Sequence, residues 1–295
     1  MKLPFFCFSL NALRPLMTVC CLPLFVGCAG METTERTDGQ DVNWASAAPV
    51  NPNPNSTGSE AAEAVKWLHC AFPGKKSTRY RAVRLDGRDA VLSESDSSAS
   101  MLRQTLRIEP AGLDRLSFSW KVPKMISGAD MTQRDSDDSP VRVVLAFEGD
   151  RSKFSAKNAM LSELALALTG EPLPYATLMY VWGTHSVPES VIINPRTDRI
   201  RKLVLESGPA RLGRWLDYER DVRADYEKAF GEAPGALVGI AIMTDSDNTR
   251  QQAKAWYGPV TFIKKPHPMI ASQTQTAVSV QALQTPEFAP LFLQD

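Results

Sequence analysis

The heptapeptide MTDSDNT, Met243 to Thr249, concentrates acidic, amide and hydroxyl side chains between an apolar run and an aromatic-rich segment. Asp245, Asp247 and Asn248 are residue types that bind hard cations such as Ca²⁺, which prefer carboxylate and amide oxygens. Because Ca²⁺ takes about six to eight ligands, a second acidic segment, RDSDD at residues 134–138, would have to supply others. The heptapeptide lacks the spacing, glycine and final Glu of an EF-hand. A Ca²⁺ site is therefore one of three predictions for this segment.

The same two aspartates also suit a catalytic pair or a plain turn. In an extended chain the carboxylates of Asp245 and Asp247 would lie on one side, roughly 6.6 Å apart, which overlaps the carboxylate spacing of glycoside hydrolysis. Neighbours on one exposed loop, however, seldom have the contrasting environments that separate two pKa values. Asp and Asn are also frequent in turns, because their side chains bond to nearby backbone groups. We expect a structured turn, with the metal and catalytic alternatives left open.

Four further side chains suggest ligand binding. Arg142 follows the RDSDD segment, and in a cleft its planar guanidinium would suit a substrate carboxylate or sugar hydroxyls. Tyr180 and Trp182 are two residues apart on a predicted strand and so share one face, and Trp256 lies on another strand. Exposed rings of this kind stack on sugars, although the core of a β-sandwich uses the same residues. The candidate ligand-binding residues are thus Arg142, Tyr180, Trp182 and Trp256.

His185 follows the segment YVWGT in a predicted loop and has the pKa range of a general base. An enzyme built on this chain would draw its catalytic residues from Arg142, Tyr180, His185, Asp245 and Asp247. The sequence has no His/Cys cluster with zinc spacing, no Gly-x-Ser-x-Gly elbow and no phosphate-binding glycine loop. Lys plus Arg equals Asp plus Glu at 33 each, which argues against nucleic-acid binding. We expect no nucleotide or nucleic-acid partner, and no cofactor beyond the Ca²⁺ considered above.

Short alternating segments must position these residues. Leu116, Phe118 and Trp120 alternate with serines, which is typical of a strand with one buried face. Asp86-Gly87 between two such segments is a strong hairpin signal. The predicted strands are TRYRAVRL, DAVLSESD, LDRLSFSW, VRVVLAFEG, YATLMYVWG, RIRKLVLES, ALVGIAIMT and KAWYGPVTFI.

Two helices interrupt the predicted strands. Residues 155–169 carry an apolar stripe of Met160, Leu161, Leu164 and Leu168 and end at Gly170. Residues 221–230 begin at an Asp able to cap the helix and stop at a Gly. Many short strands and few helices predict a mainly β fold, a jelly-roll-like antiparallel β-sandwich with two short helices.

The first 28 residues have the features of an export signal. Lys2 and Arg14 precede an apolar run that is too short to span a membrane, and the run ends in LFVGC. This ending resembles the lipobox of bacterial lipoproteins, with Cys28 as the lipidated residue. In such lipoproteins an Asp after the cysteine favours retention at the inner membrane, and here Ala29 takes that place. The resemblance implies a lipid-anchored protein of the bacterial envelope, at the outer membrane and facing the periplasm.

The rest of the chain divides into three parts. Residues 29–63 are rich in Thr, Asn, Pro, Ser, Gly and Ala, a composition typical of a flexible tether. Residues 64–264 form the predicted β-sandwich domain, which contains Cys70 as its single cysteine. Residues 265–295 are predicted to be a loose C-terminal tail.

Several segments of the domain, in order, resemble the family catalogued as domain of unknown function 3047. They are FPGKKSTRY, YVWGT, NPRTDRI, SGPARLGRW, RDVRADYEKAFGEAP and MTDSDNTRQQAKAWYG. The resemblance implies an exported bacterial protein and leaves its activity open. Pro259, after WYG, departs from the acidic residue expected in the family, which weakens any mechanism that would use an acid there.

Three hypotheses about function follow. The first is an anchored β-sandwich that binds a glycan or another extended envelope ligand without catalysing a reaction on it. The second is a polysaccharide lyase or hydrolase on the same scaffold. The third is an envelope scaffold that binds another protein. Sugar binding inferred from a jelly-roll rests on analogy between folds. The side chains of the site are therefore needed to choose among the three hypotheses.

Overall fold

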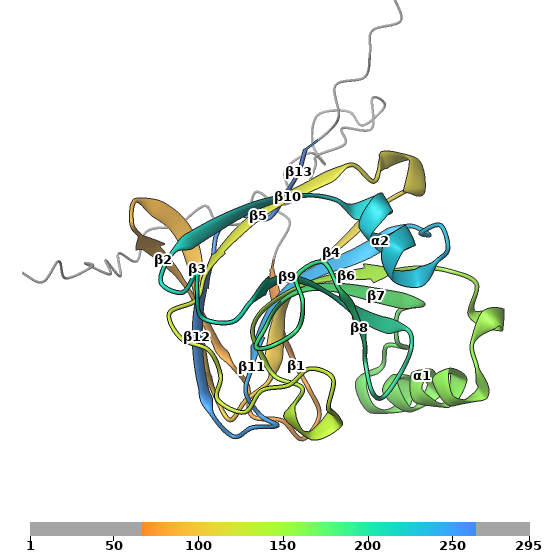
Figure 1. The fold of residues 1–295 in the computed structure, drawn as a ribbon. Coiled ribbons are helices and arrows are strands. Elements are labelled where there is room, and N and C mark those ends of the chain that lie inside the picture. Colours follow the sequence, from red (N-terminus) through yellow and green to blue (C-terminus); the bar gives the residue numbers. More distant parts are fainter. Residues whose placement is uncertain (1–66, 264–295) are drawn as a thin grey trace, which may run out of the picture.

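Two curled β-sheets pack face to face in the computed structural model, which describes residues 67–263 (Figure 1). The first sheet has seven strands in the order β1-β4-β11-β6-β7-β9-β8. These strands are β1 (Leu68–Ala71), β4 (Ser100–Ile108), β6 (Ser139–Phe147), β7 (Ala176–Gly183), β8 (Val191–Ile193), β9 (Ile200–Ser207) and β11 (Leu237–Asp245). All its pairs are antiparallel except β7 with β9.

The second sheet has six strands, with β13 paired to β5 beside the path β10-β5-β12-β3-β2. These strands are β2 (Arg79–Leu85), β3 (Arg88–Asp96), β5 (Arg115–Lys121), β10 (Trp215–Asp221), β12 (Gln252–Tyr257) and β13 (Thr261–Ile263). The predicted hairpin joins β2 to β3, and Asp86 and Gly87 both have positive φ there, 53° and 74°. A mirror-image turn of this kind needs residues that tolerate the left-handed region.

The prediction of a mainly β sandwich with two helices is confirmed for the described residues. Leu116, Phe118 and Trp120 face the main core between the sheets, as their alternation predicts. The parallel pair of β7 and β9 differs from the expected all-antiparallel pattern. A crossover of residues 184–199, which contains β8, brings the chain back in the same direction, as a parallel pair requires.

The helices begin and end where their capping residues predict. In α1 (Ala156–Thr169) the Ser155 side chain accepts a hydrogen bond from the Asn158 amide, and Gly170 adopts the left-handed conformation. In α2 (Val222–Phe230) Asp221 caps the start in the same way and Gly231 ends the helix. α2 buries Val222, Tyr226 and Ala229 against the core, whereas Met160, Leu164 and Leu168 of the apolar stripe of α1 face solvent. No helix within residues 67–263 is both long and apolar enough to cross a membrane.

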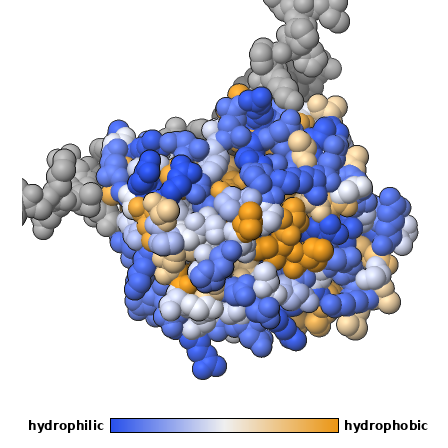
Figure 2. Space-filling view, viewed as in Figure 1, coloured by the Kyte–Doolittle hydropathy of each residue, from blue (hydrophilic) through white to orange (hydrophobic). Residues whose placement is uncertain are grey.

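The face seen in Figure 2 is largely hydrophilic, with one apolar patch near its centre, in the region where Figure 1 places β8. Val187 and Ile193, just before and within this edge strand, are 71% and 52% exposed. The predicted signal peptide with Cys28, the tether and the tail lie outside the described residues.

Candidate functional site

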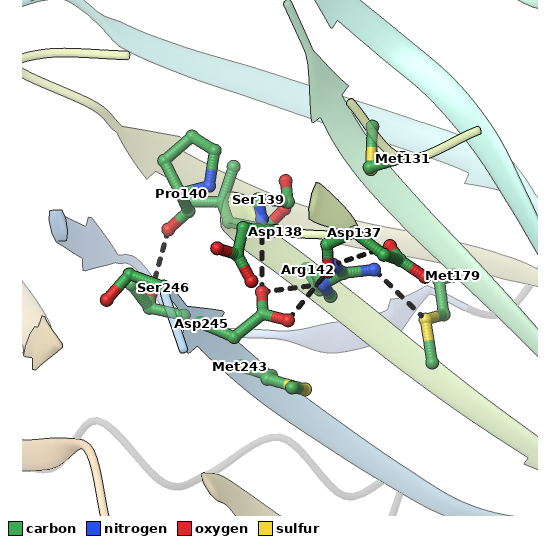
Figure 3. A network of polar contacts seen from close by, with 12 residues as sticks. Met131, Asp137, Asp138, Ser139, Pro140, Arg142, Met179, Met243, Asp245 and Ser246 are labelled. Carbon is green, nitrogen blue, oxygen red and sulfur yellow. Dashed lines mark hydrogen bonds and ion pairs between the residues drawn. The ribbon is translucent and has the colours of Figure 1, made fainter. Parts of the chain in front are cut away.

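A buried group of charges lies on the outer side of the seven-stranded sheet (Figure 3). We call Asp137, Arg142, Lys202 and Asp245 the charge network. Arg142 comes from β6, Lys202 from β9 and Asp245 from the end of β11, while Asp137 lies in the loop before β6. Their neighbours in the strands, Val141, Val143 and Leu203, point into the main core. Because successive side chains of a strand point to opposite faces, the charged side chains lie on the other side of the sheet.

Each charge of the network has an opposite charge within hydrogen-bond distance. Arg142 donates from Nε to Asp245 Oδ1 at 2.9 Å and from Nη2 to Asp245 Oδ2 at 3.0 Å. Its Nη2 also donates to Asp137 Oδ1 at 3.1 Å. Lys202 Nζ donates to both oxygens of Asp137, at 2.6 and 2.7 Å, and to the Met131 carbonyl at 3.0 Å. Two anions thus compensate two cations, and all four residues are at most 5% exposed.

The electrostatics reflect the competition between burial and pairing. Burial acts to raise the pKa of Asp137, but Arg142 and Lys202 outweigh it and hold that pKa below its usual value. For Asp245 burial prevails and raises the pKa to about 6, in spite of Arg142. Burial, together with the nearby Arg142 guanidinium, lowers the pKa of Lys202 to about 8. Such a network ties three strands and a loop together, and it offers no open face to a substrate.

The segment MTDSDNT begins as the end of β11 and continues from Asp247 into the structured turn that the sequence favours, and Asp138 holds this turn from the facing loop. One oxygen of Asp138 accepts the backbone and side-chain amides of Asn248, at 3.2 and 3.0 Å. The other accepts the backbone amide and the hydroxyl of Thr249, at 2.7 and 2.6 Å. Asp247 pairs with Lys75. The turn is thus fixed by a carboxylate about a hundred residues earlier in the chain, at position 138.

The predicted cation ligands come together only in part. Oxygens of Asp138, Asp245 and Asp247 all lie within 4.8 Å of one another, so the two acidic segments do meet. Asn248, in contrast, directs its side-chain amide N–H groups at Asp137 and Asp138. The oxygens of Asp138 and Asp245 already accept hydrogen bonds from Asn248, Thr249, Ser139 and Arg142. We therefore assign these carboxylates the role of joining the two loops.

The candidate aromatic residues lie inside the protein. Tyr180 and Trp182 share the core-facing side of β7 and are 0% and 1% exposed. The Tyr180 hydroxyl donates to Asp225 at 2.8 Å, and the Trp182 indole donates to the Gly208 carbonyl at 3.0 Å. Trp256 packs on the other side of the six-stranded sheet with Val83 and Leu85 of the β2–β3 hairpin, and is 9% exposed. None of these rings, nor the buried Arg142, presents an open surface on which a sugar could stack.

His185 is exposed in the loop after β7. It lines a surface hollow of about 380 Å³ together with Asp130, Thr132 and Ser186. His185 does not belong to the charge network that contains Arg142 and Asp245. The five candidate catalytic residues therefore do not form a single site.

An open groove lies on the outer side of the seven-stranded sheet, across β4, β11 and β6. Thr105, Gly239 and Ala146 stand opposite one another in the register of these strands and form its floor. Their small side chains leave a volume of about 750 Å³ above the sheet. Its walls include Pro172 and Pro174, from the segment that follows α1. We call this feature the sheet groove, and its volume is in the range of ligand-binding clefts.

Charged side chains of both signs line the sheet groove. Arg103 forms a bidentate pair with Glu171, at 2.7 and 3.0 Å. Arg107 contacts Glu109 at 2.7 Å and Glu148 at 2.9 Å. With Arg151 the groove has three arginines and three glutamates, so its formal charge is zero. The groove therefore presents partly exposed donors and acceptors that can bond a neutral, hydroxyl-rich ligand.

Neither Lys202 nor the groove residues are among the sequence candidates. Lys202 could have been recognised from its position, because a lysine in the middle of the predicted strand RIRKLVLES is unusual. The signal for the groove is the alternation of Arg103, Thr105 and Arg107 with Leu102, Leu106 and Ile108 in β4, a strand that is not among those predicted, although Gln104 interrupts the apolar series.

Comparisons with known proteins bear on the family of the chain more than on its function. No curated protein matches the chain. Among solved structures, the xyloglucanase domain of NopAA, a type three effector from Sinorhizobium fredii, in complex with cellobiose, has a TM-score of 0.36 and 10% identity, over 68% of this chain and 93% of that chain. A likeness at this level supports no argument about function. The family model described as protein of unknown function, DUF3047, matches residues 65–261, and the chain belongs to this family.

Proposed function

We propose that this protein is a non-catalytic binding protein of the bacterial cell envelope, anchored by lipid at Cys28, which holds a neutral glycan strand in the sheet groove. The observation that carries the proposal is the groove itself: an open channel over a floor of small side chains, with arginine and glutamate groups along its walls. A sugar chain lying there would exchange hydroxyl–water hydrogen bonds for bonds to fixed donors and acceptors.

The balance of charge favours a neutral ligand. An acidic polysaccharide would meet three glutamates as well as three arginines and would gain no net attraction. A neutral glycan needs donors and acceptors in equal measure, which the paired side chains supply.

The surroundings of Glu171, one of the three groove glutamates, favour binding over hydrolysis. A glycosidase needs a carboxylic acid that keeps its proton near neutral pH, which requires a raised pKa. The hydrogen bonds from Arg103 instead lower the pKa of Glu171. A carboxylate held ionised in this way accepts hydrogen bonds from sugar hydroxyls and does not donate a proton to a leaving group.

The envelope location rests on the sequence. The apolar run before LFVGC and the cysteine at position 28 support lipidation, and Ala29 supports the outer membrane, facing the periplasm. Lipidation at Cys28 would hold the domain next to the glycans of the envelope.

Size-exclusion chromatography with a panel of polysaccharides tests the proposal. We expect the protein to co-elute with at least one neutral polysaccharide that keeps its original size, and not with acidic polymers of matched length. Conversion of any polymer to fragments would overturn the non-catalytic assignment and support the lyase or hydrolase. A panel without any shift would overturn glycan binding and favour a protein partner.

A further inference from the structure

Helix α1 exposes apolar side chains to solvent and buries polar ones. Met160, Leu164 and Leu168, spaced four residues apart on one stripe, are 64%, 53% and 61% exposed. The residues that α1 buries are polar, Asn158 and Ser162, each 4% exposed. A surface helix of a soluble domain normally has the opposite arrangement. The exposed stripe of α1 is therefore suited to an apolar surrounding.

Polar contacts fix this orientation of α1. The Asn158 amide donates to Asp198 at 2.6 Å and accepts from the Thr197 hydroxyl at 2.7 Å, both in the loop between β8 and β9. Ser162 accepts from Arg151 at 2.9 Å. Turning the helix over would break these bonds and bury its unpaired polar groups, which is costly. The stripe of leucines is thus held outward by specific contacts on the opposite side of the helix.

The described chain begins close to the C-terminal end of α1. Leu68, at the start of β1, is paired in register with Arg103 of β4. Arg103 forms its bidentate ion pair with Glu171, which comes directly after Gly170 at the end of α1. Leu68 is itself 59% exposed. The point at which the predicted tether joins the described domain is therefore linked, through Arg103 and Glu171, to the C-terminal end of α1.

The reach of the chain between the anchor and the domain is comparable to the width of the domain. Between Cys28 and Trp67 lie residues 29–66, and a chain of their composition has a typical reach of roughly 30–40 Å. At that distance a lipid at Cys28 keeps the start of β1 near the bilayer surface. Two exposed lysines near the start of α1, Lys153 and Lys157, would meet the phosphate groups of the lipids.

We propose that the exposed stripe of α1, formed by Met160, Leu164 and Leu168, docks on the phospholipid bilayer and lies in its interface. An apolar helix face of this kind sinks into the boundary between headgroups and acyl chains. The occupant that we propose is the bilayer, because the tether from the lipidated Cys28 joins the domain close to α1 and is long enough for the helix to meet the membrane surface. The inference rests on the lipid anchor of the proposed function and is independent of glycan binding.

The test uses the full chain, made in a bacterium that processes lipoproteins and reconstituted in vesicles of phosphatidylethanolamine and phosphatidylglycerol. Cys70, the free cysteine of the described residues, is replaced by Ser, and an environment-sensitive fluorophore is attached through Leu164→Cys. The matched control carries Glu219→Cys on β10, which lies at the far side of the molecule from α1 in Figure 1. Flotation of the vesicles first establishes whether the chain is anchored at all.

We expect the fluorophore at position 164 to shift to the blue and to lose about half its intensity when the lipids carry brominated acyl chains, because an interfacial helix sinks about 5–10 Å into the bilayer. The fluorophore at position 219 should show neither change. Equal behaviour at both positions in floating vesicles would overturn the proposal. A blue shift without bromine quenching would also overturn it, since another protein surface would then cover α1. If the protein did not float with the vesicles, the lipid anchor and the docking of α1 would both be refuted. The proposed glycan binding would still stand or fall by the chromatography assay.

Discussion

Replacing Asp137 by Ala should destabilise the domain by about 3–5 kcal/mol, the usual cost of removing one partner from a buried ion pair. Asp137 is the acceptor for both Lys202 and Arg142. Without it, the fully buried ammonium group of Lys202 keeps its hydrogen bond to the Met131 carbonyl but has lost its paired carboxylate. The free energy of unfolding in urea measures the loss.

Asp247→Ala is the matched control for this experiment. Asp247 also pairs with a lysine, but that lysine, Lys75, is 41% exposed. A partly exposed pair contributes about 0–1 kcal/mol, so this change should have little effect. The double change Asp137→Ala with Lys202→Met should recover much of the lost stability, because it removes the unpaired charge. Equal losses for Asp137→Ala and Asp247→Ala would contradict a compensated buried network.

Replacing Trp182 by Ala should cost about 3–5 kcal/mol of the free energy of unfolding, as for other large aromatic residues removed from a core. Trp182 is 1% exposed within the main core, and its indole also bonds to the Gly208 carbonyl. The change would leave a cavity and an unsatisfied carbonyl. Thermal and urea unfolding of the variant provide the measurement.

Trp215→Ala is the comparison, since Trp215 lies half-buried on the outer side of the six-stranded sheet and bonds to Asp86. We expect it to lose roughly 1–2 kcal/mol, because less apolar surface is removed from the interior. If Trp182→Ala left stability unchanged and abolished ligand binding, Trp182 would be a ligand contact and its place in the core would be refuted.

The fold could be predicted from the sequence further than the site. Alternation reveals which residues share a face of a strand, so it predicts that Tyr180 and Trp182 lie on one face, as they do in the main core. It does not reveal whether that face meets the other sheet or solvent, because the partner strands come from distant parts of the chain. Here β5 supplies Phe118, stacked on Tyr180 at 5.5 Å, and this long-range contact decides the burial.

The buried charges illustrate the same limit. A link between the RDSDD segment and Asp245 could be anticipated, since both are acidic and Arg142 lies beside the first. The position of Lys202 could not, because its partner Asp137 is 65 residues away and meets it only through the order β6-β7-β9. Periodicity likewise predicts α1 but not the outward direction of its apolar stripe, which contacts from Asn158 and Ser162 determine.

The most direct test of the central claim is a titration of the Gly239→Leu variant with the neutral polysaccharide found in the panel. Gly239 forms the groove floor, and a Cβ there would meet Ala146 at 3.6 Å and the Gln104 carbonyl at 3.7 Å, which are ordinary contacts. A leucine would therefore fill the groove without straining the backbone. The control is Ala82→Leu on β2, an exposed strand position of the other sheet.

Calorimetry should show at least about a tenfold loss of affinity for Gly239→Leu, equivalent to about 1.4 kcal/mol, and unchanged affinity for Ala82→Leu. The two variants should unfold at similar urea concentrations. Unchanged affinity in a folded Gly239→Leu variant would contradict the account, because the glycan would then bind outside the sheet groove.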